Sequence, residues 1–262
     1  MVLDPEEGLN PDGTIRTGVH RERVPAEFEP VVVAAVEALR DFFDEHAELH
    51  LYGSVATGKA RLGISDVDLV AIGVPEGWAR GMSAALSTRF MDVCRGVEIG
   101  PGQPADFRGD GDAAYGNRVF LRHYCVPLAG PNGLRSAEPF PGDARAARGF
   151  NGNIGRCLDI WRAGADPRRV ARKTLLAAAG VISVHDRTWT TDRGRAARRW
   201  AELDPDHADD MARLLGWAEG HRVPSAGELD AALGRNGVVA VVVDRFAAEV
   251  GLWSDPVAPD AG

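Results

Sequence analysis

The sequence predicts an α+β protein in two parts, with a small sheet in the first part and helices alone in the second. Strand-like and helix-like apolar patterns alternate through about residue 125, and only helical patterns continue beyond a Gly- and Pro-rich stretch at 127–143. A chain of 262 residues is long enough for two domains that each bury a core. We expect an N-terminal arm at 1–29, a first domain at 30–134 and a helical domain at 135–262.

Periodic patterns predict the elements of the first domain in order. Apolar residues recur at helical spacing over 30–43, and the next segment, "ELHLY", alternates as a strand does. A Gly-Ser step leads into "SVATG", a short helical turn that Gly58 can end in the left-handed conformation. A second strand, "DVDLVAIG", is followed by a helix from Pro75 to about Arg95 and by a short apolar strand, "GVEIG".

Helices alone are predicted after the Gly- and Pro-rich stretch, because no strand pattern returns there. Phe150, Ile154, Cys157 and Trp161 lie at helical spacing and predict one helix. The same period runs through "RRVARKTLLAAAGVISVHD", "TDRGRAARRWAEL" with Thr191 or Asp192 as its N-cap, "HADDMARLLGWAEG", and a last segment of one or two helices, "SAGELDAALGRNGVVAVVVDRFAAEVGLW". The second half is therefore expected to be a helical bundle.

Composition excludes several classes of protein. No apolar run approaches the roughly 20 residues that a membrane helix needs, so no membrane association is expected. The first residues, "MVLDPEEGLNPDG", lack the basic start and apolar stretch of a secretory signal, which indicates a loose arm on a cytoplasmic protein. The three cysteines, Cys94, Cys125 and Cys157, form no C-x-x-C pair and are expected to be buried thiols.

The formal net charge of −8 bears on the partners of the chain. A protein that neutralises nucleic-acid phosphates needs a concentrated basic face, so a nucleic-acid partner is not expected. An acidic chain favours a small cationic substrate instead. We expect the chain to act on such a substrate as a monomer.

Two aspartates, Asp66 and Asp68, open the second predicted strand. Because side chains alternate along a strand, both point to the same face, roughly 6.5 to 7 Å apart. Mg²⁺ prefers oxygen ligands and is commonly held by one or two carboxylates together with substrate phosphates. The pair therefore predicts a magnesium site for nucleotide transfer, and the alternative is a pair of solvated turn acids.

Gly53 and Ser54 stand at the end of the preceding strand. Glycine lets the backbone come close to a phosphate, and free N–H groups with a serine hydroxyl can bind anions. This step predicts the phosphate half of the same site, although either pair of residues alone is common by chance.

The combined order of strand, Gly-Ser step, short helix, Ser65 and Asp-x-Asp resembles the nucleotidyltransferase superfamily, which includes DNA polymerase β and kanamycin nucleotidyltransferase. The segment "LHLYGSVATGKARLGISDVDLV" is similar to the aminoglycoside 3″- and 9-adenylyltransferases, the streptomycin and spectinomycin resistance enzymes. The resemblance implies a polymerase-β-like domain with a small mixed sheet, joined to a C-terminal all-α bundle. It also implies ATP as co-substrate, Mg²⁺ as cofactor, and Ser65 beside the nucleotide.

The resemblance assigns residues in the helical half as well. Trp161 and Asp166 in "WRAGAD" have the spacing of a Trp and an Asp that contact streptomycin in the family. Arg193 falls where the family has a lysine at the nucleotide phosphates, although a guanidinium is not equivalent to an ammonium. Arg172, in the basic segment "DPRRVARK", is a further candidate for the triphosphate, and a solvated helix face is the alternative.

Glu98 in "GVEIG" fits the position of the family's third carboxylate, which acts as general base and completes the metal site with Asp66 and Asp68. A carboxylate near metal-bound phosphates stays deprotonated readily, so it can serve as a base. Asp92 and Asp106 are the competing candidates. A solvent-exposed strand Glu is the plain alternative.

These observations predict a Mg²⁺-dependent adenylyltransferase that moves AMP from ATP to a hydroxyl of an aminoglycoside- or aminocyclitol-like molecule, as in antibiotic resistance. Two rival functions stay open. One is a nucleotidyltransferase that modifies a protein or tRNA acceptor, as antitoxin-type members do, and the other is a non-catalytic nucleotide-binding relative.

Overall fold

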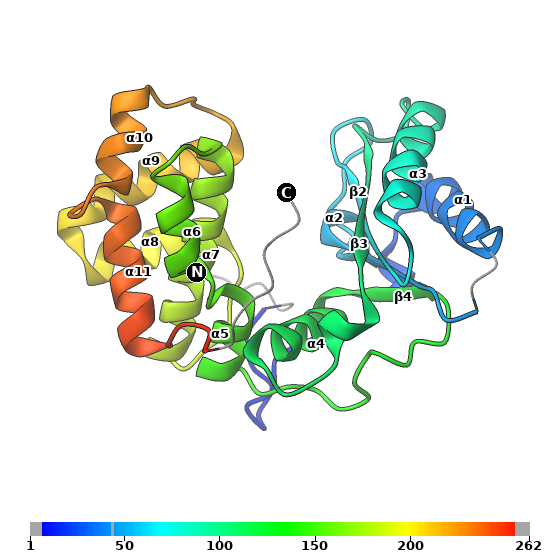
Figure 1. Cartoon of the computed structure of the whole chain (residues 1–262), viewed down its shortest axis with the longest axis horizontal. Helices are drawn as coiled ribbons and strands as arrows, with labels where there is room; N and C mark the ends of the chain where they lie inside the picture. The colour runs from blue at the N-terminus through cyan, green and yellow to red at the C-terminus, as the bar shows by residue number, and fades with distance from the viewer. Residues whose placement is uncertain (1–6, 43–44, 255–262) are drawn as a thin grey trace. The chain divides into compact units, whose positions relative to one another are not determined.

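The computed structural model describes residues 7–42 and 45–254, which fold into two compact units (Figure 1). The sheet unit comprises residues 16–110 and 117–139. The helical unit comprises the described residues up to Ile15, a short segment at 111–116, and the described residues from Phe140 to Ser254.

The sheet unit is built on four strands: β1 Glu48–Tyr52, β2 Val67–Ile72, β3 Val97–Gly102 and β4 Val126–Ala129. Their order in the sheet is β3-β2-β1-β4. β2 and β3 are parallel, whereas β1 is antiparallel to both β2 and β4. This mixed sheet, with an all-helical second half, confirms the α+β fold class predicted from the sequence.

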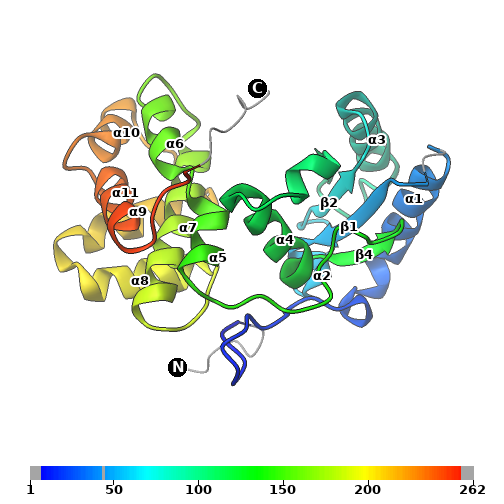
Figure 2. The ribbon, with the colours of Figure 1, turned by 60° about the horizontal axis from the view of Figure 1, so that its bottom comes forward.

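Helices cover both faces of the sheet (Figure 2). They are α1 Glu29–Arg40, α3 Glu76–Arg89 and α4 Asp112–Tyr124, with the one-turn α2 Gly53–Ala56 and three 3₁₀ turns, η1 Arg21–Arg23, η2 Ala26–Phe28 and η3 Pro104–Phe107. The α1 and α3 side holds the larger apolar core, which includes Leu49, Leu69 and Ile99. The opposite face packs Ile72 against Leu121 of α4.

The alternation of side chains explains why the two faces differ. Leu69 and Ala71 of β2 point into the larger core, whereas Val70 and Ile72 join the smaller cluster under α4. Asp68 shares the second face with Val70 and Ile72. The aspartate pair therefore lies at the beginning of β2, on the face of the sheet whose apolar residues pack under α4.

β4 lies at the start of the Gly- and Pro-rich stretch, where the sequence predicts a linker and no strand. It is only four residues long, and Pro127 lies within it, so its sequence carries little strand signal. Proline is tolerated because β4 is an edge strand, and the register between β1 and β4 shifts at Leu49 and His50. A segment whose sequence is typical of a linker thus becomes a strand because it pairs with the free edge of β1.

The described part of the expected N-terminal arm, residues 7–29, is folded rather than loose. Ile15 is 1% exposed and pairs through its backbone N–H with the Phe140 carbonyl oxygen at 2.9 Å in the helical unit. Val19 and Phe28 are buried in the core of the sheet unit. The arm is therefore divided between the two units, and residues 1–6 lie outside the described part.

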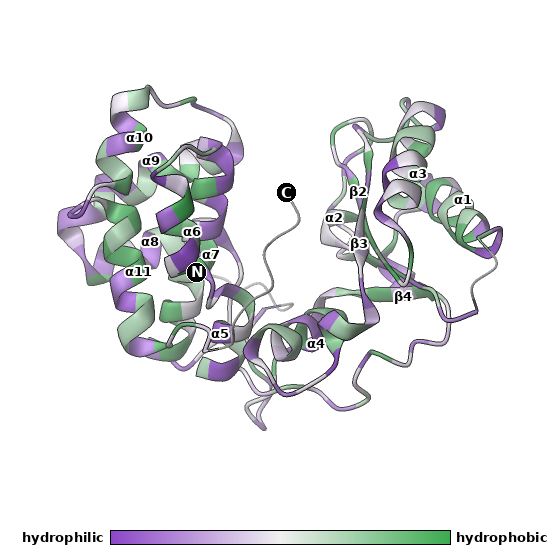
Figure 3. Ribbon diagram, in the orientation of Figure 1, coloured by the Kyte–Doolittle hydropathy of each residue, from purple (hydrophilic) through white to green (hydrophobic). Residues whose placement is uncertain are grey.

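The helical unit contains α5 Ala144–Asn151, α6 Ile154–Trp161, α7 Pro167–His185, α8 Arg193–Leu203, α9 Ala208–Glu219, α10 Ala226–Leu233 and α11 Val238–Glu249, with a 3₁₀ turn, η4 Pro205–His207. Asp192, one of the two predicted caps, accepts a hydrogen bond from the Arg195 N–H at 2.6 Å. Much of α11 is hydrophobic (Figure 3) and buries Val239, Val242 and Phe246.

One predicted helix is broken in two. Residues 150–161 were expected to form one helix, but the chain turns at Gly152 and Asn153 between α5 and α6. The Trp253 ring lies so close to Gly152 that a Cβ there would collide with it. Trp253 also donates from its indole N–H to the Arg148 carbonyl oxygen at 2.7 Å. A distant residue thus fixes the break.

No helix in residues 7–42 or 45–254 combines the length and the apolar character that crossing a bilayer would require.

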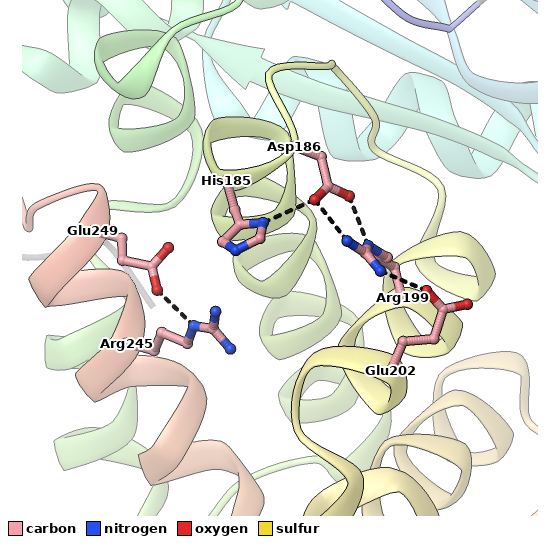
Figure 4. A network of polar contacts seen from close by, with 6 residues as sticks. All are labelled: His185, Asp186, Arg199, Glu202, Arg245 and Glu249. Carbon is pink, nitrogen blue, oxygen red and sulfur yellow. Dashed lines mark hydrogen bonds and ion pairs between the residues drawn. The ribbon is translucent and has the colours of Figure 1, made fainter.

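An ion-pair network joins the end of α7 to α8 (Figure 4). Asp186 accepts two hydrogen bonds from Arg199, at 2.8 and 3.0 Å, and a third contact from His185 at 2.8 Å. Arg199 also donates to Glu202. The Arg199 guanidinium, helped by His185, lowers the pKa of Asp186 from 3.8 to about 2.

We predict that Asp186→Asn destabilises the chain at neutral pH and that this effect fades in acid. A carboxyl group whose pKa is lowered by folding stabilises the fold above its ordinary pKa, and the stabilisation is lost as pH falls from about 4 toward 2. Urea unfolding at pH 7, 5 and 3 measures the difference, and Arg199→Gln should remove the same pH-dependent increment. An equal loss at pH 7 and pH 3 would contradict the assignment.

Candidate functional site

Three polar residues form a row across β1, β2 and β3. Asp68 is paired in register with Tyr52 of β1 on one side and with Glu98 of β3 on the other. Paired residues on neighbouring strands lie about 5 Å apart and point to the same face of the sheet. The sheet therefore brings two predicted carboxylates together, with a phenol beside them.

Gly53 places backbone directly against Asp68. Its φ of 74° is in the left-handed region, and a Cβ at this position would collide with Oδ2 of Asp68. The Gly53 carbonyl oxygen accepts a bond from the Thr57 hydroxyl at 3.2 Å, which holds the single turn of α2. Only glycine allows the chain to leave β1 this close to the Asp68 carboxylate, and Ser54 follows directly in α2.

Asp66 lies just before β2 and is held by Arg95. The Arg95 Nε donates to Oδ1 of Asp66 at 2.9 Å, and a second guanidinium nitrogen contacts Oδ2. The Arg95 backbone N–H also bonds to the Ser65 carbonyl oxygen at 3.1 Å. Asp66 shares the face of Asp68 by alternation, but its carboxylate is already bound by the exposed Arg95 guanidinium.

Tyr52 is a neighbour of the carboxylates that sequence reasoning missed. Burial raises the pKa of its phenol, and the negative charges of Asp68 and Glu98 raise the pKa further. The phenol therefore stays protonated at neutral pH and keeps a hydrogen to donate. The sequence did contain a signal for Tyr52: it comes directly before the Gly-Ser step, so it is the residue of β1 nearest to the turn at Gly53.

The sheet register separates Glu98 from its two competitors. Glu98 is exposed on β3 beside Asp68. Asp106 accepts a bond from the Gln103 backbone N–H at 2.8 Å and forms the capping box of η3. Asp92 lies in the turn after α3, outside β3. Of the three candidates, Glu98 is therefore the one that stands in the row with Asp68.

Ser65 has a structural contact of its own. Its hydroxyl oxygen accepts a bond from the Arg61 backbone N–H at 2.9 Å, and its own N–H bonds to the Arg61 carbonyl oxygen at 2.9 Å. These bonds close the turn that leads into Asp66. Nucleotide binding by Ser65 stays a prediction.

The donor set suits a hard divalent cation. Asp66, Asp68 and Glu98 offer only carboxylate oxygens, and the Gly53 backbone lies directly against Asp68. Within the described residues no three His, Cys, Asp or Glu side chains converge closely enough to hold a metal ion. Mg²⁺ commonly uses one or two carboxylates and takes its other ligands from phosphates and water, so the set fits such an ion.

The predicted residues of the second half all lie in the helical unit. Trp161, Asp166 and Arg172 line one pocket of about 400 Å³ between α6 and α7. Asp166 also accepts a bond from the Arg168 backbone N–H at 3.0 Å as the N-cap of α7. Arg193 is the first residue of α8 and is not among the residues lining that pocket.

Cys157 differs from its expected state as a buried thiol. Cys94 and Cys125 are buried, but Cys157 is partly exposed and lines the pocket beside Trp161. It lies one helical turn before Trp161 on α6, so both side chains are on the face of the helix that lines the pocket.

Residues 34–80 match the family model described as nucleotidyltransferase domain. The match runs from α1 to the start of α3 and includes Gly53, Ser54, Asp66 and Asp68, but it ends before Glu98. It confirms the resemblance to the nucleotidyltransferase superfamily. A comparison with curated proteins gave no match.

Among solved structures, the chain is similar to spectinomycin adenyltransferase AAD(9) from Enterococcus faecialis, crystallised with ATP and spectinomycin. The TM-score is 0.55 at 10% sequence identity, and the likeness covers 83% of this chain and 98% of that chain. At this identity the likeness concerns the fold, and it extends over both halves of the chain.

We predict that Gly53→Ala lowers the free energy of unfolding more than Gly63→Ala does. Both glycines have a left-handed φ, which costs a residue with a Cβ roughly 1 to 2 kcal/mol, but only at Gly53 would the new methyl group meet another residue, Asp68. Urea unfolding of the two variants measures the difference. Adding Asp68→Ala to Gly53→Ala should recover part of the loss, and equal losses in the two single variants would contradict the contact.

We predict that Arg95→Gln strengthens binding of Mn²⁺ in the absence of nucleotide. Arg95 competes with any metal for Asp66, and an exposed ion pair of this kind is worth about 0.2 to 1 kcal/mol, so the gain should be roughly 1.4-fold to fivefold. The electron paramagnetic resonance signal of free Mn²⁺ measures it. Arg80→Gln, which removes the exposed Arg80–Glu76 pair on α3, is the matched control. Unchanged affinity in Arg95→Gln would argue against the competition.

Proposed function

We propose that this chain, a nucleotidyltransferase by its matched domain and its fold, transfers AMP from ATP to a hydroxyl group of a small molecule. The observation that carries the proposal is the row of Asp68 and Glu98 in register on β2 and β3, with the Gly53 backbone against Asp68. A pair of carboxylates beside a glycine-lined turn is the arrangement that nucleotide transfer requires.

The nucleotide would be held mainly through its phosphates. Gly53 carries no side chain that would keep a phosphate away from the backbone, and Ser54, with its hydroxyl, follows it directly. Ser65, Arg193 and Arg172 are proposed as further nucleotide contacts. The cations would act on the negative charge of the phosphates, and Arg193 would do so from the first turn of α8.

Asp66 and Asp68 are proposed as Mg²⁺ ligands, with Glu98 at the edge of the same site. When bound, the metal would neutralise charge on the phosphates and polarise the phosphorus–oxygen bond that breaks. For Asp66 to serve as a ligand, its carboxylate must leave the Arg95 guanidinium. Arg95 would then be a cation next to the phosphates, where its charge is favourable.

Glu98 is proposed as the general base that takes the proton from the acceptor hydroxyl. It is solvent-exposed, so an acceptor can approach it, and it lies beside Asp68 without the capping contact that engages Asp106. The hydroxyl oxygen attacks the α-phosphorus, the bond to the pyrophosphate oxygen breaks, and pyrophosphate leaves. Positioning of the hydroxyl in line with that bond would supply much of the rate enhancement.

The acceptor class is the finer part of the proposal. The fold is similar to that of an enzyme crystallised with spectinomycin, and the net charge of −8 favours a cationic partner in bulk solution. We therefore put forward an aminoglycoside- or aminocyclitol-like acceptor and an antibiotic-resistance role, with Trp161 and Asp166 as candidate acceptor contacts. The spacing of these two residues supports that assignment.

Incubating the purified chain with MgATP and a panel of aminocyclitols, followed by mass spectrometry, tests the transfer. We expect one compound to gain the mass of one AMP, and we expect Asp68→Asn and Asp66→Asn to abolish the gain while the fold is kept. Label from ATP appearing on protein or tRNA instead would favour the macromolecular acceptor. No magnesium-dependent binding of ATP by calorimetry would favour the non-catalytic relative.

We predict that Glu98→Gln slows AMP transfer by about 10²- to 10⁴-fold without changing the affinity for ATP, because a general base contributes an effect of this size to the chemical step alone. Single-turnover rates and calorimetric ATP binding separate the two effects. Asp92→Asn is the matched control and should transfer at the wild-type rate. A Glu98→Gln variant with full turnover would move the base elsewhere.

A further inference from the structure

The pocket between α6 and α7, which contains the proposed contacts Trp161, Asp166 and Arg172, has a set of charged side chains that a cationic acceptor does not explain. It has a volume of about 400 Å³, which is within the range of small-molecule sites, and it lies wholly in the helical unit. The buried ring of Trp161 lines it, together with the side chains of Cys157 and Leu176. The remaining lining residues are polar or charged.

Four cationic side chains of α7 line this pocket: Arg168, Arg169, Arg172 and Lys173. Their spacing places them on one side of the helix, because residues four apart lie one turn above each other. Among the described residues that line the pocket, Asp166 supplies the one carboxylate, which is exposed and already accepts the bond that caps α7. A cationic ligand in this pocket would meet one opposite charge and four like charges.

Backbone carbonyl groups hold three of these cations in place. Arg168 and Arg172 both donate from Nε to the Ala218 carbonyl oxygen of α9, at 3.3 and 3.2 Å, and the Lys173 Nζ donates to the Phe150 carbonyl oxygen at 3.0 Å. A carbonyl oxygen orients a cation but carries no net charge. The bonds therefore orient these three side chains around the pocket.

Asn153 adds a neutral polar group to the same pocket. Its Oδ1 atom is buried and has no hydrogen-bond partner among the described residues. A buried acceptor without a donor is costly, and a ligand hydroxyl would satisfy it. The pocket thus offers positive charge for an oxyanion and an acceptor for a hydroxyl group.

We infer that this pocket binds the phosphate-type oxyanion of a hydroxyl-bearing small molecule. Guanidinium groups match the geometry of phosphate oxygens with two parallel N–H donors, and α7 supplies three of them beside an ammonium. Trp161 supplies an apolar surface for the rest of the ligand. The oxyanion comes from one of two sources, the phosphates of the nucleotide or a phosphate on the acceptor. Only this choice of source rests on the proposed function, because oxyanion binding requires no turnover.

Calorimetry on the full chain without metal tests the inference, with sodium tripolyphosphate and glucose 6-phosphate as probes. Arg169→Gln removes one pocket cation that is exposed on α7, and Arg198→Gln removes an exposed arginine of α8 outside the pocket. We expect Arg169→Gln to weaken binding by about tenfold or more, the range for a hydrogen bond to a charged group, and Arg198→Gln to change it less than twofold.

The two probes distinguish the sources of the oxyanion. Weaker binding of tripolyphosphate and of ATP by Arg169→Gln would identify the nucleotide, whereas an effect on glucose 6-phosphate alone would identify a phosphorylated acceptor. The inference is overturned if neither probe binds or if both bind Arg169→Gln as tightly as the wild type. Asp68→Asn separates this result from the transfer reaction, since it should lose AMP transfer and keep binding in the pocket.

Discussion

The close approach of the Gly53 backbone to the Asp68 carboxylate is the constraint on which the site depends. It follows from the register that pairs Tyr52 with Asp68, since the residue after Tyr52 then meets the carboxylate as the chain leaves β1. A slip of one residue would turn Asp68 into the larger core, where its neighbours Val67 and Leu69 are fully buried. The burial of those apolar residues therefore fixes the position of the carboxylate, and a charged group is held in place by the core behind it.

Local periodicity predicted the parts of the fold that depend on neighbouring residues, and it failed where distant contacts decide. The alternation in "ELHLY" and "DVDLV" predicted β1 and β2 and the shared face of Asp66 and Asp68, because one face of each strand packs on the core. β4 has no such pattern and exists because β1 offers an edge. The break after α5 likewise depends on Trp253, about a hundred residues away in the sequence.

The residues of the candidate site also fall into those that a local pattern predicts and those that depend on distant contacts. Asp66, Asp68 and the Gly-Ser step lie within one short segment, whereas Glu98 came from a resemblance, and its place beside Asp68 depends on the parallel pairing of β2 and β3. Arg95 could not be expected from spacing, because its contact with Asp66 joins residues 29 positions apart. It has a clear electrostatic reason, since Arg95 feels the negative charges of Asp66, Asp68 and Glu98 together.

The net charge of the chain is a poor guide to what each site binds. At physiological ionic strength, salt screens exposed charges beyond about 8 Å, so a ligand inside a pocket responds to the side chains that line it and hardly to the sum over the chain. The acidic total favours a cationic partner, and the row at Asp68 agrees with it by concentrating carboxylates. The pocket beside Trp161 has the opposite character, with four cations and one carboxylate. Within the described residues, a chain of net charge −8 therefore gathers carboxylates on β2 and β3 of the sheet unit and cations on α7 of the helical unit.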